Sequence, residues 1–202
     1  MNAALLIMGV VLLPVLYHVA FPIRLPKLEN YFAPGQSFHS EAEGITMNIL
    51  RQEGTRVHCE FRFSPGAGCQ LQHRHEHFDQ SGTVTKGTLV LRADKQLLRI
   101  SAGGRVHLPR GTPHLMSNRG TGEVLLRCEG EEDALPVSYA YGLSKRYPLN
   151  RSKSLNLRLY AMTCVLESHF DSVPHGWTPV TIRMLRKLAK PYARLWVGRS
   201  AQ

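Results

Sequence analysis

The sequence predicts an all-β domain with a helical segment at each end. Short strand-like runs fill the middle of the chain, an uncharged apolar segment precedes them, and a basic helical pattern follows them. With 202 residues, the chain has room for one domain with extensions. We expect a transmembrane helix over 1–24, a linker over 25–37, a β-barrel over 38–140 and a helical, basic extension over 145–202.

The N-terminal segment has the length of one membrane span. From Ala3 to Ile23 the chain runs for 21 residues without a Lys, Arg, Asp or Glu, and a bilayer takes about 20 apolar residues in a helix. A signal peptide fits less well because it would begin with basic residues and end in a small-residue cleavage site; a buried helix is the other alternative. Arg24 and Lys27 follow the segment at once. The positive-inside tendency then favours a single-pass membrane protein with its barrel on the cytoplasmic side.

The middle of the chain alternates short strands with turns. In the run TRVHCEFRF, the apolar residues from Val57 to Phe63 occupy every second position, which is typical of a half-buried antiparallel strand. Turn-forming runs rich in Gly and Pro separate the strands. Many short strands at this spacing predict a sandwich or barrel, with a jelly roll as one form. The strand-like runs are ITMNIL, TRVHCEFRF, TLVLRA, QLLRIS, RVHLP and EVLLRCE.

The run HRHEHFDQ carries the first candidate site. His73, His75 and His77 stand at every second position, so a strand would place their rings on one face. Buried imidazoles need partners, and a metal ion supplies one. About 40 residues later, His114 follows a Pro-x-Gly turn in the run GGRVHLPRGTPHLMSN.

These two runs resemble the paired motifs of the cupin superfamily, of the cupin type 2-like kind. In the first motif His73 and His75 match the HxH element, Gly87 matches the closing glycine, and Gln80 falls where the family has a glutamate. The second motif is matched at every position, by Gly103, Pro109, Gly111, His114 and Asn118. The resemblance implies a cupin-type, RmlC-like jelly-roll β-barrel.

The resemblance also implies a metal site with His73, His75, Gln80 and His114 as ligands. The ion in cupins is commonly iron, manganese, nickel or zinc, and this ligand set does not choose among them. A metal-free pocket that keeps the histidines is the alternative. Cupins often form dimers, so a homodimer is a further expectation.

Glutamine in place of glutamate has consequences for the predicted site. The amide brings a carbonyl oxygen without charge, so we expect weaker metal binding and more positive charge at the ion, which favours an anionic small-molecule ligand. Strand alternation points Asp79 away from Gln80, so Asp79 would serve only if a bulge shifted the register. His77 could be an extra ligand, a partner of a ligand or the catalytic acid/base.

The C-terminal region is basic and helical in pattern. Residues 145–202 contain 11 basic and two acidic residues and carry most of the net charge of +10. We expect one helix from Ser154 to His169. We expect a second that is capped by Thr178 and kinked or split by Pro191. Its basic amphipathic pattern favours binding to an anionic membrane surface, with packing on the barrel as the alternative. No nucleic-acid recognition motif is present, so no nucleic-acid partner is expected.

Two classes of function fit these features. The first is a metal-dependent enzyme of oxygenase or isomerase type, with His77 as the catalytic candidate. The second is a non-catalytic module that binds a small ligand or a partner at the membrane. A barrel alone does not decide between them.

Overall fold

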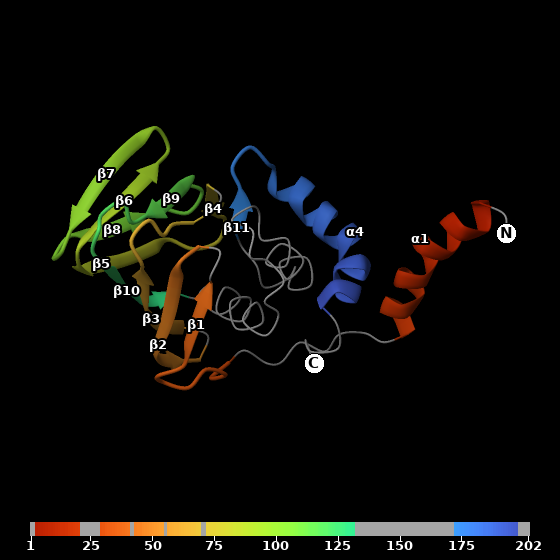
Figure 1. Ribbon diagram of the computed structural model, residues 1–202, viewed down its shortest axis with the longest axis horizontal. Helices are drawn as coiled ribbons and strands as arrows, with labels where there is room; N and C mark the ends of the chain where they lie inside the picture. Colours follow the sequence, from red (N-terminus) through yellow and green to blue (C-terminus); the bar gives the residue numbers. More distant parts are fainter. Residues whose placement is uncertain are drawn as a thin grey trace.

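The computed structural model describes residues 3–20, 29–40, 43–54, 56–69, 72–131 and 172–197. Figure 1 shows a β-domain, with helices α4 (Pro179–Val197) and α1 (Ala3–Ala20) to one side of it. The predicted helix from Ser154 to His169, residues 25–28 of the predicted linker and the end of the predicted barrel beyond 131 lie outside the described residues.

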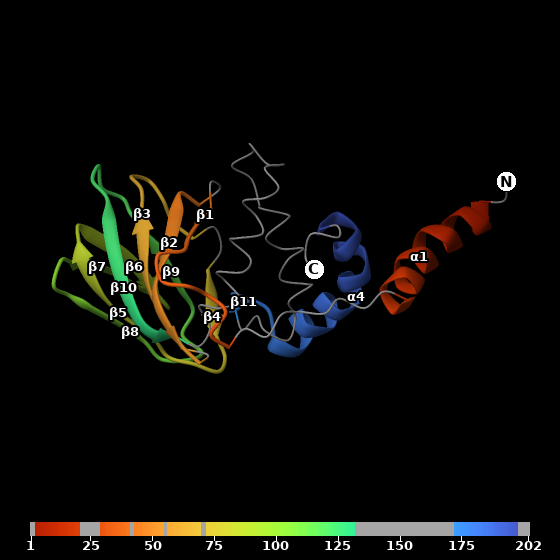
Figure 2. The same cartoon turned by 90° about the horizontal axis from the view of Figure 1, so that it is seen from below.

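The β-domain consists of two antiparallel sheets that face each other (Figure 2). The six-stranded sheet has the order β1 (Ser37–Ser40), β2 (Ile45–Glu53), β3 (Arg56–Phe63), β10 (Val124–Glu131), β5 (Gln80–Lys86), β8 (Arg105–Leu108). The five-stranded sheet has the order β11 (Ser172–Pro174), β4 (His73–His75), β9 (His114–Ser117), β6 (Thr88–Ala93), β7 (Gln96–Ser101). This mostly-β arrangement of two sheets confirms the jelly-roll part of the predicted fold class.

One hydrophobic core joins the two sheets. On β3 the predicted alternation holds, because Val57, Cys59 and Phe63 are buried while Arg56 and Arg62 are exposed. Strand β3 therefore buries one face, and the hydrophobic effect is the main force that holds the sheets together. The fully or almost fully buried members from both sheets include Ile45, Met47, Ile49, Val84, Leu89, Leu91, Met116, Val124 and Leu126.

A glycine is required at the turn between β5 and β6. Gly87 has a positive φ of 75°, a conformation that residues with a Cβ rarely adopt. A Cβ added there would lie 2.6 Å from the carbonyl oxygen of Glu123. Both the backbone conformation and the close approach of β10 therefore exclude a side chain at this position.

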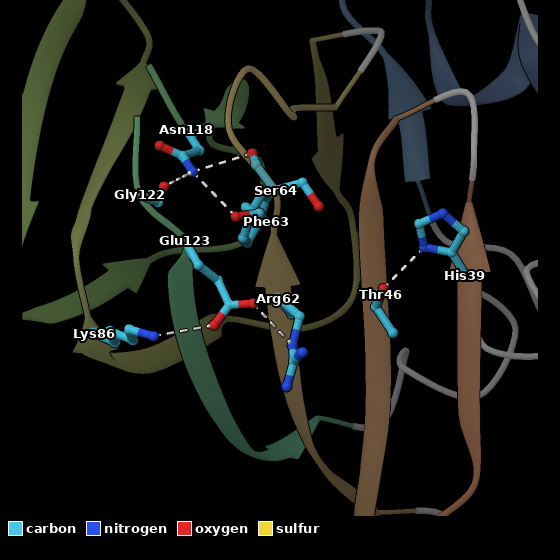
Figure 3. Close-up of polar contacts among 9 residues, drawn as sticks. All are labelled: His39, Thr46, Arg62, Phe63, Ser64, Lys86, Asn118, Gly122 and Glu123. Carbon is cyan, nitrogen blue, oxygen red and sulfur yellow. Dashed lines mark hydrogen bonds and ion pairs between the residues drawn. The ribbon is translucent and has the colours of Figure 1, made fainter. Parts of the chain in front are cut away.

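Asn118, the last residue of the second motif, joins two segments of the chain (Figure 3). Its side chain is buried, and Nδ2 donates to the carbonyl oxygens of Phe63 (3.0 Å), Ser64 (3.1 Å) and Gly122 (2.7 Å). Its Oδ1 accepts a hydrogen bond from the amide of Gly120 at 2.9 Å. Asn118 is therefore a structural residue that joins the end of β3 to the turn between β9 and β10.

Replacing Asn118 by aspartate should destabilise the domain strongly. The substitution removes the Nδ2 donor and directs a carboxylate at carbonyl oxygens, and each buried group that loses its partner costs about 1–3 kcal/mol. We expect the free energy of unfolding to fall by about 3 kcal/mol, measured by urea denaturation. The control is Gln96→Glu, the same chemical change on the exposed strand β7. A similar loss in both variants would show that the hydrogen bonds of Asn118 do not stabilise the domain.

Figure 3 also shows three polar contacts on the six-stranded sheet. Glu123 lies within 3.3 Å of Arg62 and 3.4 Å of Lys86, and His39 Nδ1 lies 2.9 Å from Thr46 Oγ1. The cationic side chains of these ion pairs are exposed, so each pair is worth no more than about 1 kcal/mol.

The two described helices lie beyond β11 (Figures 1 and 2) and contact each other. Thr178 caps α4 as predicted, because its Oγ1 accepts the amide of Thr181 at 3.1 Å. The helix runs past Pro191 without a break. Of the predicted kink or split, the split is therefore wrong, because the helix continues through Pro191, which lacks a backbone N–H donor.

The predicted transmembrane helix over 1–24 is not supported, because within the described residues no helix combines the length and apolar character needed to cross a membrane.

Candidate metal centre

Three histidines from two neighbouring strands meet at one point. His73 and His75 lie on β4, and His114 begins β9 directly opposite His73. Their ring centroids lie 4.6 to 5.2 Å apart. One nitrogen from each ring falls within 4.8 Å of the others, so the three side chains can hold one metal ion. The structure thus brings together the three histidine ligands that the sequence predicts.

Hydrogen bonds from the Pro-x-Gly turn, which precedes His114, hold this turn to the chain segment that contains the first motif. Gly111 has a positive φ of 82°, and its amide donates to the carbonyl oxygen of His75 at 2.6 Å. The neighbouring amide of Arg110 donates to Asp79 Oδ1 at 2.9 Å. Asp79 therefore joins the two motifs through this turn, a role that the sequence did not reveal, and its side chain is exposed rather than turned towards the histidines.

His114 is oriented and neutral before any ion binds. Its Nδ1 lies 3.0 Å from the carbonyl oxygen of Thr112, which favours a proton on Nδ1 and leaves Nε2 as the ligand atom. Burial lowers the pKa of His114 from 6.5 to about 3, and the adjacent His73 adds to this effect. A neutral imidazole is the form that binds metal.

In the metal-free protein, His114 should make folding sensitive to acid. Its folded-state pKa of about 3 lies below its ordinary value of 6.5, so between these values the unfolded chain binds a proton that the folded chain lacks. The free energy of unfolding should therefore fall as the pH drops through this range, by at most about 1.4 kcal/mol per pH unit. Urea denaturation at several pH values should show a shallower pH dependence for His114→Asn than for the natural chain. Equal slopes would contradict the prediction.

Gln80 faces the same interior from the other sheet. It begins β5 and shares the inward face of that strand with the buried Val84. Its Oε1 is buried and has no hydrogen-bond partner within the described part of the chain. Because a buried carbonyl oxygen without a partner is costly, an ion there would satisfy it. The donor set of three neutral imidazoles and one amide oxygen fits a divalent transition metal.

His77 does not share the face of His73 and His75. Strand β4 ends at His75, the chain bends over the next two residues, and His77 is exposed. The prediction that it points with the other histidines assumed a longer strand and is wrong. Its neighbour Glu76 pairs with Arg74, whose Nε lies 2.6 Å from Glu76 Oε1.

Strand β11 is the part of the site region that the sequence did not predict. It is three residues long, includes a proline and pairs with β4 from about 100 residues further along the chain. No local pattern identifies such a strand, because its partner is distant and it is too short for a period to appear.

Comparisons with known proteins give one family match. Residues 59–128 match the family model described as Cupin domain. The comparison with curated proteins found no match.

Among solved structures, a cupin-superfamily sugar phosphate isomerase from Silicibacter pomeroyi is 22% identical, with 53% of this chain and 71% of that chain covered and a TM-score of 0.39. KdgF from Halomonas sp. is 24% identical, with 48% and 92% covered and a TM-score of 0.40. An RmlC-like cupin from Shewanella frigidimarina is 16% identical, with 50% and 91% covered and a TM-score of 0.40. The region that matches the Cupin domain model contains all three histidines.

Proposed function

We propose that the cupin domain holds a divalent transition metal through His73, His75 and His114, with Gln80 as a further ligand, and that this centre binds a small anionic molecule. The observation that carries the proposal is the cluster of three imidazole nitrogens within 4.8 Å of one another. The buried Oε1 of Gln80, which has no hydrogen-bond partner among the described residues, supports it from the opposite sheet.

The charge of the ligand set supports an anionic partner. Three neutral imidazoles and a neutral amide leave the charge of a divalent ion uncompensated, whereas a glutamate would offset part of it. A bound ion would supply Lewis-acid polarisation of an oxygen on the small molecule. As an enzyme, the protein would then be of the isomerase or oxygenase type, with His77 as its acid/base candidate.

A non-catalytic binding module is the second candidate, and one observation favours it. The acid/base candidate named from the sequence, His77, is exposed beyond the end of β4, and its neighbour Glu76 pairs with Arg74. A ligand that bound there would meet the metal ligands without either of these groups beside it.

Metal analysis followed by reaction-class assays would test both candidates. The purified full chain should bind about one equivalent of Zn²⁺, Mn²⁺, Ni²⁺ or Fe²⁺, and cobalt-loaded protein should change its visible spectrum when oxalate, a small dianion, is added. An enzyme should show metal-dependent proton exchange in small hydroxycarbonyl compounds or metal-dependent oxygen uptake. Binding of metal and oxalate without turnover would favour the binding module. A chain that binds no metal would contradict both.

We also propose that α4 and α1 bring the domain to a membrane, with the barrel on its cytoplasmic side. Along α4 the exposed apolar side chains Val180, Met184 and Leu188 recur every fourth residue, so they form a stripe. The exposed Arg183 and Lys187 lie beside it. An apolar stripe with a cationic border suits an anionic lipid surface.

Vesicle flotation would test this membrane proposal. The full chain should float with vesicles that contain phosphatidylglycerol, and Met184→Glu combined with Leu188→Glu should reduce flotation at least tenfold if α4 contributes. The control is Leu97→Glu on β7, another exposed apolar residue that is far from α4 in the chain. Equal flotation of the α4 variant and the natural chain would show that α4 does not contribute.

A further inference from the structure

The strand that carries two of the three histidines is weakly held by its own domain. Strand β4 is three residues long, and its pairing with β9 has a single register pair, His73 opposite His114. Along its other edge, β11 covers the whole strand, with Ser172 opposite His75 and Pro174 opposite His73. Most of the strand pairing that holds β4 therefore comes from the C-terminal region of the chain (Figure 1).

Further contacts fix this C-terminal segment in place. The amide of His175 donates to the carbonyl oxygen of Gln72 at 2.8 Å, one residue before β4. Val173, opposite Arg74 in the pairing, is 3% exposed. Residues 172–177 thus form a buttress along β4, held by backbone hydrogen bonds and by one buried apolar side chain.

Arg74 is the side chain that joins the buttress to β4. Its Nη2 donates to the carbonyl oxygen of Trp177 at 3.2 Å, and its Nε donates to Glu76 Oε1 at 2.6 Å. Because neighbouring residues of a strand point to opposite faces, Arg74 faces away from the side on which His73 and His75 present their rings. Arg74 can therefore position the two histidines without touching an ion.

We infer that residues 172–177 are a positioning element of the metal centre, and that Arg74 is the positioning residue that fixes them. The inference rests on the proposed metal site and adds a role for the C-terminal region. Once the buttress is detached, β4 becomes an edge strand that is held by one register pair with β9 and by the hydrogen bond from the Gly111 amide to His75. His73 and His75 are then more mobile in the metal-free protein. They lose more conformational entropy when they bind an ion, so the affinity for metal falls.

The coupling is reciprocal, as any equilibrium coupling between two binding events must be. If the docked buttress favours metal binding, bound metal must favour the docked buttress. Zinc should therefore slow hydrogen exchange of the amides in residues 172–177, although none of these residues belongs to the ligand set. Helix α4 follows directly at Pro179, so a partner that draws α4 away would also weaken metal binding.

The experiment compares zinc affinity and hydrogen exchange in full-length variants. Arg74→Ala should weaken Zn²⁺ binding by about 10- to 100-fold, as loss of a group that orients metal ligands commonly does, and should speed hydrogen exchange in residues 172–177. Val173→Asp should do the same from the other strand, without a change in β4. Arg74→Lys should fall in between, because lysine keeps the charge and one donor nitrogen but lacks the second nitrogen of the guanidinium group. Arg92→Ala, an exposed arginine on β6 of the same sheet, is the control.

The outcomes separate this inference from the proposed function. Faster exchange in the buttress with unchanged zinc affinity would overturn the inference and leave the metal centre intact. Unchanged exchange in both Arg74→Ala and Val173→Asp would show that these residues do not fix the segment, which also overturns it. Absence of zinc binding in the natural chain would instead remove the proposed function itself. Circular dichroism identifies any variant that fails to fold. In that case the test is whether zinc slows hydrogen exchange of residues 172–177 in the natural chain.

Discussion

Replacing His114 by alanine should abolish metal binding, the largest effect of any single substitution in the domain. His114 is the most buried of the three histidines, with 2% of its surface exposed, and its ring lies close to both of the others. Its orientation is already set by Thr112, so the free protein holds this ligand ready. Loss of an orienting group alone costs 10- to 100-fold in affinity; loss of the ligand should cost more than about 100-fold.

A second substitution separates ligand loss from damage to the fold. Alanine also removes the donor to the carbonyl oxygen of Thr112, which should cost about 1–3 kcal/mol of stability in the metal-free protein. His114→Asn retains an N–H group that can reach towards Thr112 but lacks the outer ring nitrogen. It should therefore bind no metal while remaining more stable than His114→Ala.

Competition with a chromophoric chelator would measure the affinities, and thermal denaturation the stabilities. His107→Ala is the matched control, because His107 is an exposed histidine on β8 whose Nδ1 lies 2.9 Å from Ser81 Oγ. It should leave zinc affinity unchanged. If His114→Ala bound zinc as tightly as the control, the proposed three-histidine metal site would be contradicted.

The sequence predicted the strands that have a clear alternation. Strands β2, β3, β6, β7, β8 and β10 fall where the period-2 or apolar runs placed them. In β3 the pattern exists because one side of the strand is buried in the common core, and the apolar run of β6 reflects its three consecutive buried residues, so the evidence lies within each strand. The meeting of His73 with His114 was predicted by a different route, through the spacing of two motifs, since no local pattern joins residues 41 positions apart.

The failures have a common cause, which is that short strands carry little local information. The alternation of HRHEHFDQ continues to His77, but the strand itself stops at His75 because the chain must bend there to reach β5 in the other sheet. Strand β11 has the opposite problem, since three residues show no period. For Asp79, strand alternation indicates only the direction of the side chain. Its hydrogen bond to the amide of Arg110 depends on a turn 31 residues away, and only the folded chain shows it.

Replacing Gln80 by glutamate should change the protein in opposite directions with and without metal. In the metal-free protein the new carboxylate would occupy a position where the amide oxygen is buried and lacks a hydrogen-bond partner among the described residues. Burying a charge without a partner is costly, so we expect the metal-free variant to unfold at a lower temperature than the natural chain. With a divalent ion beside it, the same charge is compensated, and the affinity for zinc should rise at least about tenfold, or about 1.4 kcal/mol.

A variant that is less stable without metal but binds zinc more tightly would identify Gln80 as a neighbour of the ion. A substitution that only disturbed packing would lower stability in both states, and a substitution far from the ion would change neither. Gln96→Glu, on the exposed strand β7, should show the second pattern. The variant should also bind oxalate more weakly on the cobalt-loaded protein, because the added carboxylate offsets part of the positive charge that attracts an anion. Tighter zinc binding with unchanged oxalate binding would place Gln80 at the ion and remove charge as the reason for anion preference; unchanged zinc affinity would remove Gln80 from the ligand set.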